Sequence, residues 1–251
     1  MLPFLIIFIP IIGGLVVYAV NMSERFRNGF VLAVTALTGV LGLFLYTYLK
    51  DTGVVLLEYS EVLHPFGISF RIDWLSAVLV TIACSIWLLV TIYSFDYVKP
   101  MHNVKRYHTF TLVTFGATLG TLLAGDLLTL FLFFEMMSFA SYVLVIQEGH
   151  AKAMKAGFLY LIMTIGGGLA LLFGILGVYT ITGSVSFTEG GFLSSGTTLS
   201  LLSFIGFLIG FGVKAGMFPL HVWLPEAHPV APSPSSALLS GVMLKIGAFG
   251  L

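Results

Sequence analysis

The chain has 251 residues, of which 58% are hydrophobic and 9% are charged, and its mean hydropathy is +1.06. Ordinary soluble domains carry about 25% charged residues. This composition excludes that class and indicates a helical membrane protein that crosses the bilayer several times. Eleven basic and eleven acidic residues give a net charge of zero, with no basic tail or stripe. The charge pattern therefore indicates no nucleic-acid partner.

The single cysteine, Cys84, lies inside an apolar run and has no intrachain partner for a disulfide. We interpret it as a small buried apolar side chain. No cysteine and histidine residues have the spacing of a metal site. Signatures for flavin, haem, iron–sulfur clusters or quinone are also missing from the sequence. We therefore expect no cofactor in this chain and any redox chemistry to reside in partner subunits.

The first part of the chain, residues 1–108, contains three apolar segments. Residues 1–20 are about long enough to span a bilayer, and they lack the basic start and cleavage site of a signal peptide. We therefore expect a retained helix there. The other two segments are residues 29–49 and 74–95. Between them, the stretch VVLLEYSEVL is compatible with a short hairpin or an interfacial helix, and its pattern does not decide between them.

The second part, residues 109–251, contains five more apolar segments: 109–124, 127–147, 156–182, 199 to the region of Lys214, and 233–251. Asp126 precedes the second of these and is a candidate N-cap. The triplet Gly166-Gly167-Gly168 favours close helix contact or a local kink. The expected fold is an all-α integral membrane protein with about eight transmembrane helices.

Basic residues are distributed unevenly among the loops. Loops after the first, third and fifth segments carry two, three and two lysines and arginines, whereas those after the second, fourth and sixth carry two, none and none. The positive-inside rule then makes the first set cytoplasmic and places the N-terminus outside. We therefore predict a multi-pass protein of a prokaryotic plasma membrane.

Glu135 is the one acidic residue in the middle of an apolar segment. Ser138 and Tyr142 follow it at i+3 and i+7, so one helix face is polar and should turn inward. A buried carboxyl and a buried lysine restore each other's charged forms when they lie close together. Such a pair would couple two protonation events as a proton relay. The alternative is a structural ion pair between helices.

Lys214 lies in a glycine-rich apolar segment, five residues before Pro219. A proline ring clashes with the carbonyl four residues earlier, so the helix should break directly after the lysine. Broken helices at membrane depth are tolerated where they face protein or a hydrated cavity, which favours an ion path at Lys214. The alternative is a lysine whose side chain reaches out to the membrane interface.

The block after the break contains His221, His228 and the acid Glu226. Histidine exchanges protons near neutral pH, which suits an access or relay position. A metal site would require further ligands at suitable spacing, and we do not expect one. Lys245 lies about eleven residues into the last segment, so its depth makes it a stronger candidate than Lys214 for a role at the membrane midplane.

Two long motifs now indicate a family. The segments LFLFFEMMSFASYVLV, which contains Glu135, and VKAGMFPLHVWLPEAHPVAPSPSSALLSGVMLKIGAFG resemble the antiporter-like membrane subunits of respiratory complex I. The same family includes large subunits of Mrp sodium/proton antiporters, energy-converting membrane hydrogenases and sulfane-sulfur reductases. The resemblance covers residues 70–251. It implies a proton relay through Glu135, Lys214 and Lys245, with His221 and His228 as associated motif residues.

Further residues are candidate accessory members of this relay: Lys155, Asp126, Tyr142 and Glu226. Lys155 is alternatively an ordinary inside anchor, and Asp126 is better explained as a helix cap than as a titrating group. Members of the family usually continue into a second, inverted repeat, whereas residues 109–251 cover most of the first repeat. We therefore expect either a short form that works against a partner subunit or a fragment.

The resemblance implies a membrane subunit that translocates protons, or protons coupled to sodium, driven electrostatically by a redox module in other subunits. The subunit would not be catalytic alone. Expected partners are other membrane subunits, including a full-length antiporter-like homologue, a peripheral redox module and the lipid bilayer. Two alternatives remain: a sodium/proton antiporter subunit without redox coupling, and a scaffold subunit that transports nothing.

Overall fold

The computed structural model describes residues 1–59, 66–187, 191 and 196–251. Its long helices are α1 (Leu2–Ala19), α2 (Glu24–Thr52), α3 (Trp74–Tyr97), α4 (Val104–Leu122), α5 (Leu127–Val145), α6 (Ala151–Thr182) and α7 (Thr198–Ala215). Shorter helical pieces follow: η1 (Leu220–Trp223), α8 (Leu224–Ala227), α9 (Ser233–Leu238), the π-helical η2 (Leu239–Met243) and α10 (Leu244–Gly250). Two strands, β1 (Val55–Tyr59) and β2 (Ile68–Ile72), pair antiparallel.

The all-α membrane class is confirmed. Within the described residues, six helical segments are long and apolar enough to cross a membrane, namely α1, α2, α3, α5, α6 and Thr198–Ala227. The other two expected spans, α4 and Ser233–Gly250, do not belong to these six. The first is rich in threonine, and the second is interrupted by π-helical η2. Large apolar side chains on the outer faces, such as Leu89, Phe158 and Leu169, are well suited to contact lipid.

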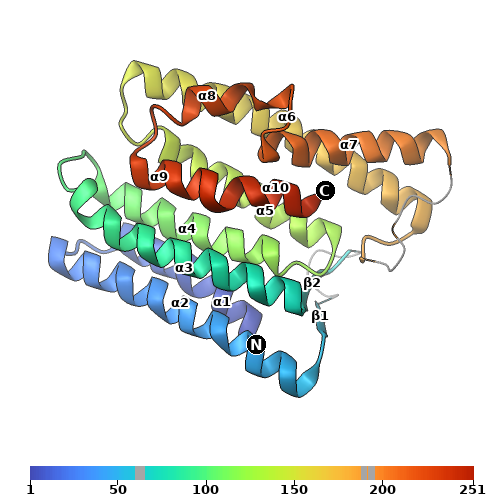
Figure 1. Cartoon of the computed structure of the whole chain (residues 1–251), viewed down its shortest axis with the longest axis horizontal. Helices are drawn as coiled ribbons and strands as arrows, with labels where there is room; N and C mark the ends of the chain where they lie inside the picture. Colours follow the sequence, from blue (N-terminus) through green and yellow to red (C-terminus); the bar gives the residue numbers. More distant parts are fainter. Residues whose placement is uncertain (60–65, 188–190, 192–195) are drawn as a thin grey trace.

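The helices lie roughly side by side, from α1 and α2 at one edge to α6 and α7 at the other (Figure 1). Helix α4 lies at the centre and packs against α1 and α5. Glycine makes this close approach possible, because a Cβ on Gly116 would lie 2.5 Å from the carbonyl oxygen of Ile7. Small residues that let helix backbones approach are typical of membrane interfaces.

The loops after α1, α3 and α5 meet at one end of the molecule. Lys105 Nζ donates to Asn21 Oδ1 at 2.9 Å, which joins the first of these loops to the start of α4. Arg106 Nη2 donates to the carbonyl of Gln147 at 3.1 Å, which joins α4 to the end of α5. We call this the basic end. The shared position of the three loops agrees with the alternation expected from the lysine and arginine count.

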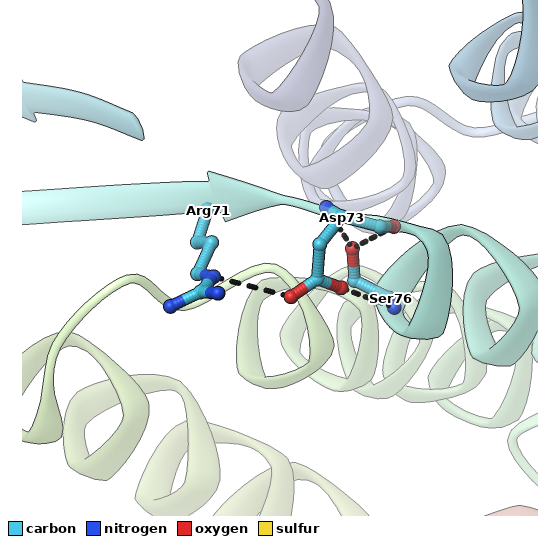
Figure 2. A network of polar contacts seen from close by, with 3 residues as sticks. All are labelled: Arg71, Asp73 and Ser76. Carbon is cyan, nitrogen blue, oxygen red and sulfur yellow. Dashed lines mark hydrogen bonds and ion pairs between the residues drawn. The ribbon is translucent and has the colours of Figure 1, made fainter. Parts of the chain in front are cut away.

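The hairpin of β1 and β2 lies at the opposite end (Figure 1). The region Val55–Tyr59 of VVLLEYSEVL is therefore a strand rather than a helix, and residues 60–63 of that stretch lie outside the described residues. Strand β2 leads directly into α3 through a capping box, in which Asp73 accepts from the Ser76 amide at 2.8 Å. Figure 2 shows Arg71 donating to the other carboxylate oxygen of Asp73, at 3.1 Å.

Helix α7 breaks where the sequence predicts. It ends at Ala215, and Gly216 follows with a φ of +70°, a left-handed conformation that suits glycine. The chain then passes through Pro219 into η1 and α8. Because a proline cannot donate a backbone hydrogen bond, α7 cannot continue through this position. In Figure 1, α7 and α8 lie in opposite halves of the molecule, with the break between them.

Candidate functional site

Lys214 is an interior residue, with 1% of its surface exposed. Its Nζ donates to Ser138 Oγ on α5 at 3.1 Å and to the hydroxyl of Tyr160 on α6 at 2.7 Å. The side chain therefore does not reach out to the interface. Its position in the last turn of α7 also places the ammonium near the negative end of the helix dipole. The buried lysine therefore lies directly beside the helix break.

A second layer of contacts holds the partners of Lys214. The Tyr160 hydroxyl lies 2.6 Å from Ser141 Oγ, and its ring packs against Trp223 with centroids 4.9 Å apart. Trp223 Nε1 donates to the carbonyl of Val213 at 2.8 Å. These bonds connect α5, α6, α7 and η1 around a single ammonium group. The lysine therefore lies in a polar, closely packed site rather than in an apolar void.

Glu135 lies on α5, one turn before Ser138, and is half-buried. Its Oε1 is buried and has no hydrogen-bond partner among the described residues. The carboxyl group packs on Gly168 of α6, where a Cβ would lie 2.4 Å from Oε1. The adjacent Gly167 contacts Val213, next to Lys214, so this glycine pair brings the carboxyl and the lysine to neighbouring positions.

No direct ion pair joins Glu135 to Lys214 in the described parts of the chain, where the ion pairs are Arg71–Asp73 and Lys99–Glu24. Ser138 is the side chain that connects α5 to the lysine. The structure thus places the expected acid and base in one cluster without a direct contact. The alternative of a structural ion pair between the helices is not formed in this conformation.

Tyr160 and Ser141 were not among the residues expected from the sequence. The expected tyrosine, Tyr142, is half-buried on α5 and packs against Gly157 of α6 instead. The signal that could have identified Tyr160 is its position deep in an apolar segment, since such a hydroxyl requires a partner. The sequence offers no indication that this partner is Lys214.

Lys245 is not part of this cluster. Its side chain is exposed and donates to the carbonyl of Ser240, in a groove that is also lined by Leu122 of α4. Helix α10 faces α7 through Gly247, where a Cβ would lie 2.4 Å from the amide nitrogen of Ala215. Because residues 245 and 247 lie on nearly opposite sides of a helix, the packing of Gly247 turns Lys245 outward.

The two motif histidines lie in different places. His221 is half-buried beside Phe218, with ring centroids 5.6 Å apart, and its buried Nδ1 has no hydrogen-bond partner in the part of the chain that the structure describes. His228 lines a polar pocket at the basic end with Glu148 and His150. Burial lowers the pKa of His228 below the ordinary histidine value. Its Nδ1 lies 2.6 Å from Ser236 Oγ.

The remaining expected residues have peripheral or structural positions. Glu226 and Lys155 are both exposed. Asp126 caps α5, where its Oδ1 accepts from the Thr129 amide at 2.7 Å. It also accepts from the backbone amide of Ser69 at 2.9 Å, which fastens β2 to the start of α5. The expected cap is confirmed, and its second partner was not anticipated. Among the described residues, no group of three or more histidine, cysteine or acidic residues could hold a metal ion.

These features define a multi-pass helical membrane protein with a broken helix and a buried, hydroxyl-bound lysine. Residues 124–251 match the model of the family described as NADH:quinone oxidoreductase/Mrp antiporter, TM. Residues 63–111 match a second family model, described as NADH-ubiquinone oxidoreductase (complex I), chain 5 N-terminus. The chain belongs to the NADH:quinone oxidoreductase/Mrp antiporter membrane family.

Individual relatives agree with this assignment. The "Putative antiporter subunit mnhD2" of Staphylococcus aureus (strain MRSA252) is 29% identical over 249 residues, which are 97% of this chain and 49% of that protein. The chain therefore spans about half the length of this relative.

Two solved structures share the fold. A chain of the membrane-bound sulfane sulfur reductase, an archaeal respiratory membrane complex, superposes with a TM-score of 0.87 at 22% identity, covering 98% of this chain and 51% of that one. A chain of the Mrp complex from Dietzia sp. DQ12-45-1b superposes with a TM-score of 0.85 at 24% identity, covering 99% and 47%.

Proposed function

We propose that this chain is a membrane subunit of a multi-subunit ion-translocating complex, in which Glu135 and Lys214 relay protons. The observation that carries the proposal is the environment of Lys214, which is buried and bonded to the hydroxyls of Ser138 and Tyr160 rather than to a carboxylate. A lysine at membrane depth costs about 3 kcal/mol on insertion scales. Two neutral hydroxyls offset part of that cost and leave the lysine free to change its protonation state.

The relay depends on the proximity of Glu135 without a direct contact. When either group takes up or releases a proton, its altered charge changes the proton affinity of the other. A direct ion pair would stabilise the charged forms of both groups and oppose a change in their protonation states. The arrangement, in which Lys214 is bonded to Ser138 and Tyr160 and Glu135 lies nearby without a direct contact, keeps the two groups coupled while each remains able to titrate.

In this proposal, the other residues expected in the relay act outside the cluster around Lys214. His228, in the polar pocket, serves as the proton-collecting group at the basic end. His221 lies between His228 and the break of α7 in the sequence and takes the next position in the relay. Lys245, on the outer surface, exchanges protons with a neighbouring subunit. Tyr142 and Lys155 are accessory residues, and Asp126 and Glu226 complete the accessory set.

The driving force comes from partner subunits in this proposal. A redox module in other subunits changes the local potential, and a full-length antiporter-like homologue completes the path in a prokaryotic plasma membrane. A second candidate is sodium/proton antiport without redox coupling. It is favoured by the antiporter designation of the Staphylococcus aureus relative and by the likeness to a chain of an Mrp complex.

The test uses proteoliposomes that contain the whole complex. Replacing Lys214→Met or Glu135→Gln should reduce proton flux more than about tenfold, equivalent to about 1.4 kcal/mol, while the complex still assembles. Lys152→Gln, at an exposed lysine of α6, is the matched control and should leave flux unchanged. Unchanged flux in the first two variants would reject the relay and leave the scaffold function. Dependence of flux on sodium without any redox substrate would identify the second candidate.

A further inference from the structure

Trp223 is the last residue of η1 and lies fully buried on the far side of the helix break from Lys214. Its Nε1 donates to the carbonyl of Val213, the residue directly before the lysine, at 2.8 Å. In an uninterrupted α-helix, this carbonyl would accept from the amide of Met217. That amide bonds elsewhere, and the Gly216 amide is 3.3 Å away. The indole therefore replaces a backbone hydrogen bond that the break removes.

The same indole ring packs on Tyr160, the residue that binds the amine of Lys214. The two ring centroids are 4.9 Å apart with planes inclined at 59°, and Tyr160 is fully buried. The Tyr160 hydroxyl accepts from Lys214 Nζ at 2.7 Å, and Nζ lies 5.1 Å from the centre of the tyrosine ring. Trp223 therefore contacts both the backbone that carries the lysine and the side chain that binds its amine.

The residues around Trp223 fix η1 against the end of α7. Leu220, Trp223 and Leu224 follow the spacing i, i+3 and i+4, which places side chains on one side of a helical segment. A Cβ on Gly212 would lie 3.3 Å from Leu220 Cδ1, and a Cβ on Gly216 would overlap Leu224. Two leucines four residues apart thus pack on two glycines four residues apart. The indole consequently has a defined position against the last turn of α7.

A second tryptophan, Trp87 of α3, makes the same kinds of contact elsewhere. It is fully buried, its Nε1 donates to the carbonyl of Thr111 at 3.2 Å, and its ring stacks on Phe115 with centroids 5.0 Å apart. These contacts join α3 to α4. Trp223 differs from Trp87 in what it holds, because its two contacts join the backbone of Lys214 to a partner of that lysine.

We propose that Trp223 is a positioning residue for Lys214. By holding the lysine backbone and the Tyr160 ring together, it keeps the tyrosine hydroxyl at hydrogen-bond distance from the amine. A hydrogen bond to a titrating group contributes to the balance between its two protonation states, so Trp223 acts on the proton through Tyr160 and does not bind it. The effect on proton flux rests on the proposed function, whereas the position of the hydroxyl does not.

The first test compares variants of the two tryptophans in the whole complex. Trp223→Phe keeps an aromatic ring for Tyr160 and removes the indole donor, and Trp223→Leu removes both. Trp87→Phe and Trp87→Leu are the matched controls. Proton flux per assembled complex is measured in proteoliposomes over a range of pH, together with thermal unfolding of the solubilised complex.

Flux should fall about threefold in Trp223→Phe and about tenfold in Trp223→Leu, so the aromatic replacement rescues part of the loss. The pH of half-maximal flux should also move to lower pH, because the ammonium loses a well-placed acceptor. The Trp87 variants should lower the unfolding temperature to a similar extent and leave this pH unchanged. A pH profile that stays unchanged in the Trp223 variants would overturn the proposal.

Other titratable groups lie near enough to require a control on the pH profile. They are Glu135 on α5, Tyr160 on α6 and His221 on η1, whereas α10 turns Lys245 outward. The profile is therefore also recorded for Trp223→Phe combined with His221→Asn and with Glu135→Gln. The shift caused by Trp223→Phe should persist in the His221→Asn background. Its disappearance there would assign the shift to the histidine and overturn the proposal.

A double-variant cycle tests the positioning without proton flux. Trp223→Phe is measured with and without Tyr160→Phe, which removes only the hydroxyl bonded to Lys214. The combined loss in unfolding temperature should be smaller than the sum of the single losses by about 2 °C or more. Trp87→Phe should add to Tyr160→Phe. Additive losses for Trp223→Phe would overturn the proposal.

The cycle also separates this proposal from the proposed function. Normal flux in Lys214→Met together with a non-additive cycle would reject the relay and retain Trp223 as the residue that positions the hydroxyl. Loss of flux in Lys214→Met together with an additive cycle would reject the role of Trp223 and retain the relay. Where Trp223→Leu does not assemble, Trp223→Phe provides the pH profile and the cycle on its own.

Discussion

Lys214 has partners that suit both of its protonation states. A hydroxyl accepts a hydrogen bond from an ammonium group and can donate one to a neutral amine. The Tyr160 hydroxyl, which also contacts Ser141 Oγ, can therefore rotate its hydrogen when the lysine loses its proton. A carboxylate in the same place would stabilise the charged form alone. This adaptability is the residue-level argument for a relay rather than a structural lysine.

The glycine triplet of α6 provides a paired prediction at this scale. Gly168→Ala would place a Cβ 2.4 Å from Glu135 Oε1 and displace the carboxyl group, so proton flux should fall about tenfold or more. Gly166→Ala is the matched control, because nothing lies within 4 Å of its added Cβ. It should retain full flux and stabilise the helix by up to about 1 kcal/mol. Both are measured in proteoliposomes, with thermal unfolding of the solubilised complex. Equal flux in the two variants would show that the position of the carboxyl does not matter.

His228 predicts a pH dependence of stability. Burial lowers its pKa from 6.5, so the unfolded chain takes up this proton at a higher pH than the folded chain does. The resulting stabilisation is complete above pH 6.5 and is lost as the pH falls through the folded-state pKa. The unfolding temperature of the solubilised complex should therefore fall as the pH decreases from 7.5 to about 5.

His228→Asn should make that decline shallower, since an asparagine amide can replace Nδ1 beside Ser236 but does not titrate. Glu148 and His150 line the same pocket, so His150→Asn is measured as the control. A decline that is equally steep in wild type and His228→Asn would assign the effect to other groups.

At the level of elements, Asp126 joins the hairpin to the helical bundle. It accepts from the amides of Ser69 and Thr129 and also lies within hydrogen-bond distance of both hydroxyls. Asp126→Ala would leave these buried donors without an acceptor, so it should lower stability by about 3 kcal/mol. Limited proteolysis of the hairpin should also become faster. Asp51→Ala, at an exposed position near the end of α2, should change neither measurement.

The elements also show what the sequence could predict. The break after α7 was predictable because Gly216 and Pro219 act through local backbone geometry. The cap at Asp126 was predictable for the same reason. The hairpin could not be distinguished from a helix, because the pairing of β1 with β2 and the contact with Asp126 depend on residues distant in the chain.

The candidate site was predictable in composition and not in geometry. Glu135 and Lys214 stand out as charges in apolar segments, but how α5, α6 and α7 face one another depends on close packing at glycines such as Gly167 and Gly168. The same limit applies to Lys245, whose outward direction follows from the packing of Gly247 on α7. Tyr160 was missed because its partner lies on another helix. The division into residues 1–108 and 109–251 stays a prediction.

At the scale of the whole molecule, the two ends differ in character. The basic end gathers the loops after α1, α3 and α5 together with the pocket of His228. The opposite end is formed by the hairpin and the residues near Val185, whose carbonyl accepts from the Leu127 amide at 2.9 Å. In the proposed function, protons are therefore collected at the basic end.

The orientation of these ends in the membrane provides the last prediction. The positive-inside rule assigns the basic end to the cytoplasm. In the Cys84→Ala background, His102→Cys and Glu148→Cys report on the basic end, and Asp51→Cys and Ser186→Cys report on the other. A membrane-impermeant maleimide added to intact cells should label only the second pair, and opened cells should show labelling of all four. The opposite pattern would place the N-terminus inside and direct the proposed proton access to the outer surface. Labelling that divides either pair would contradict the shared ends of the fold itself.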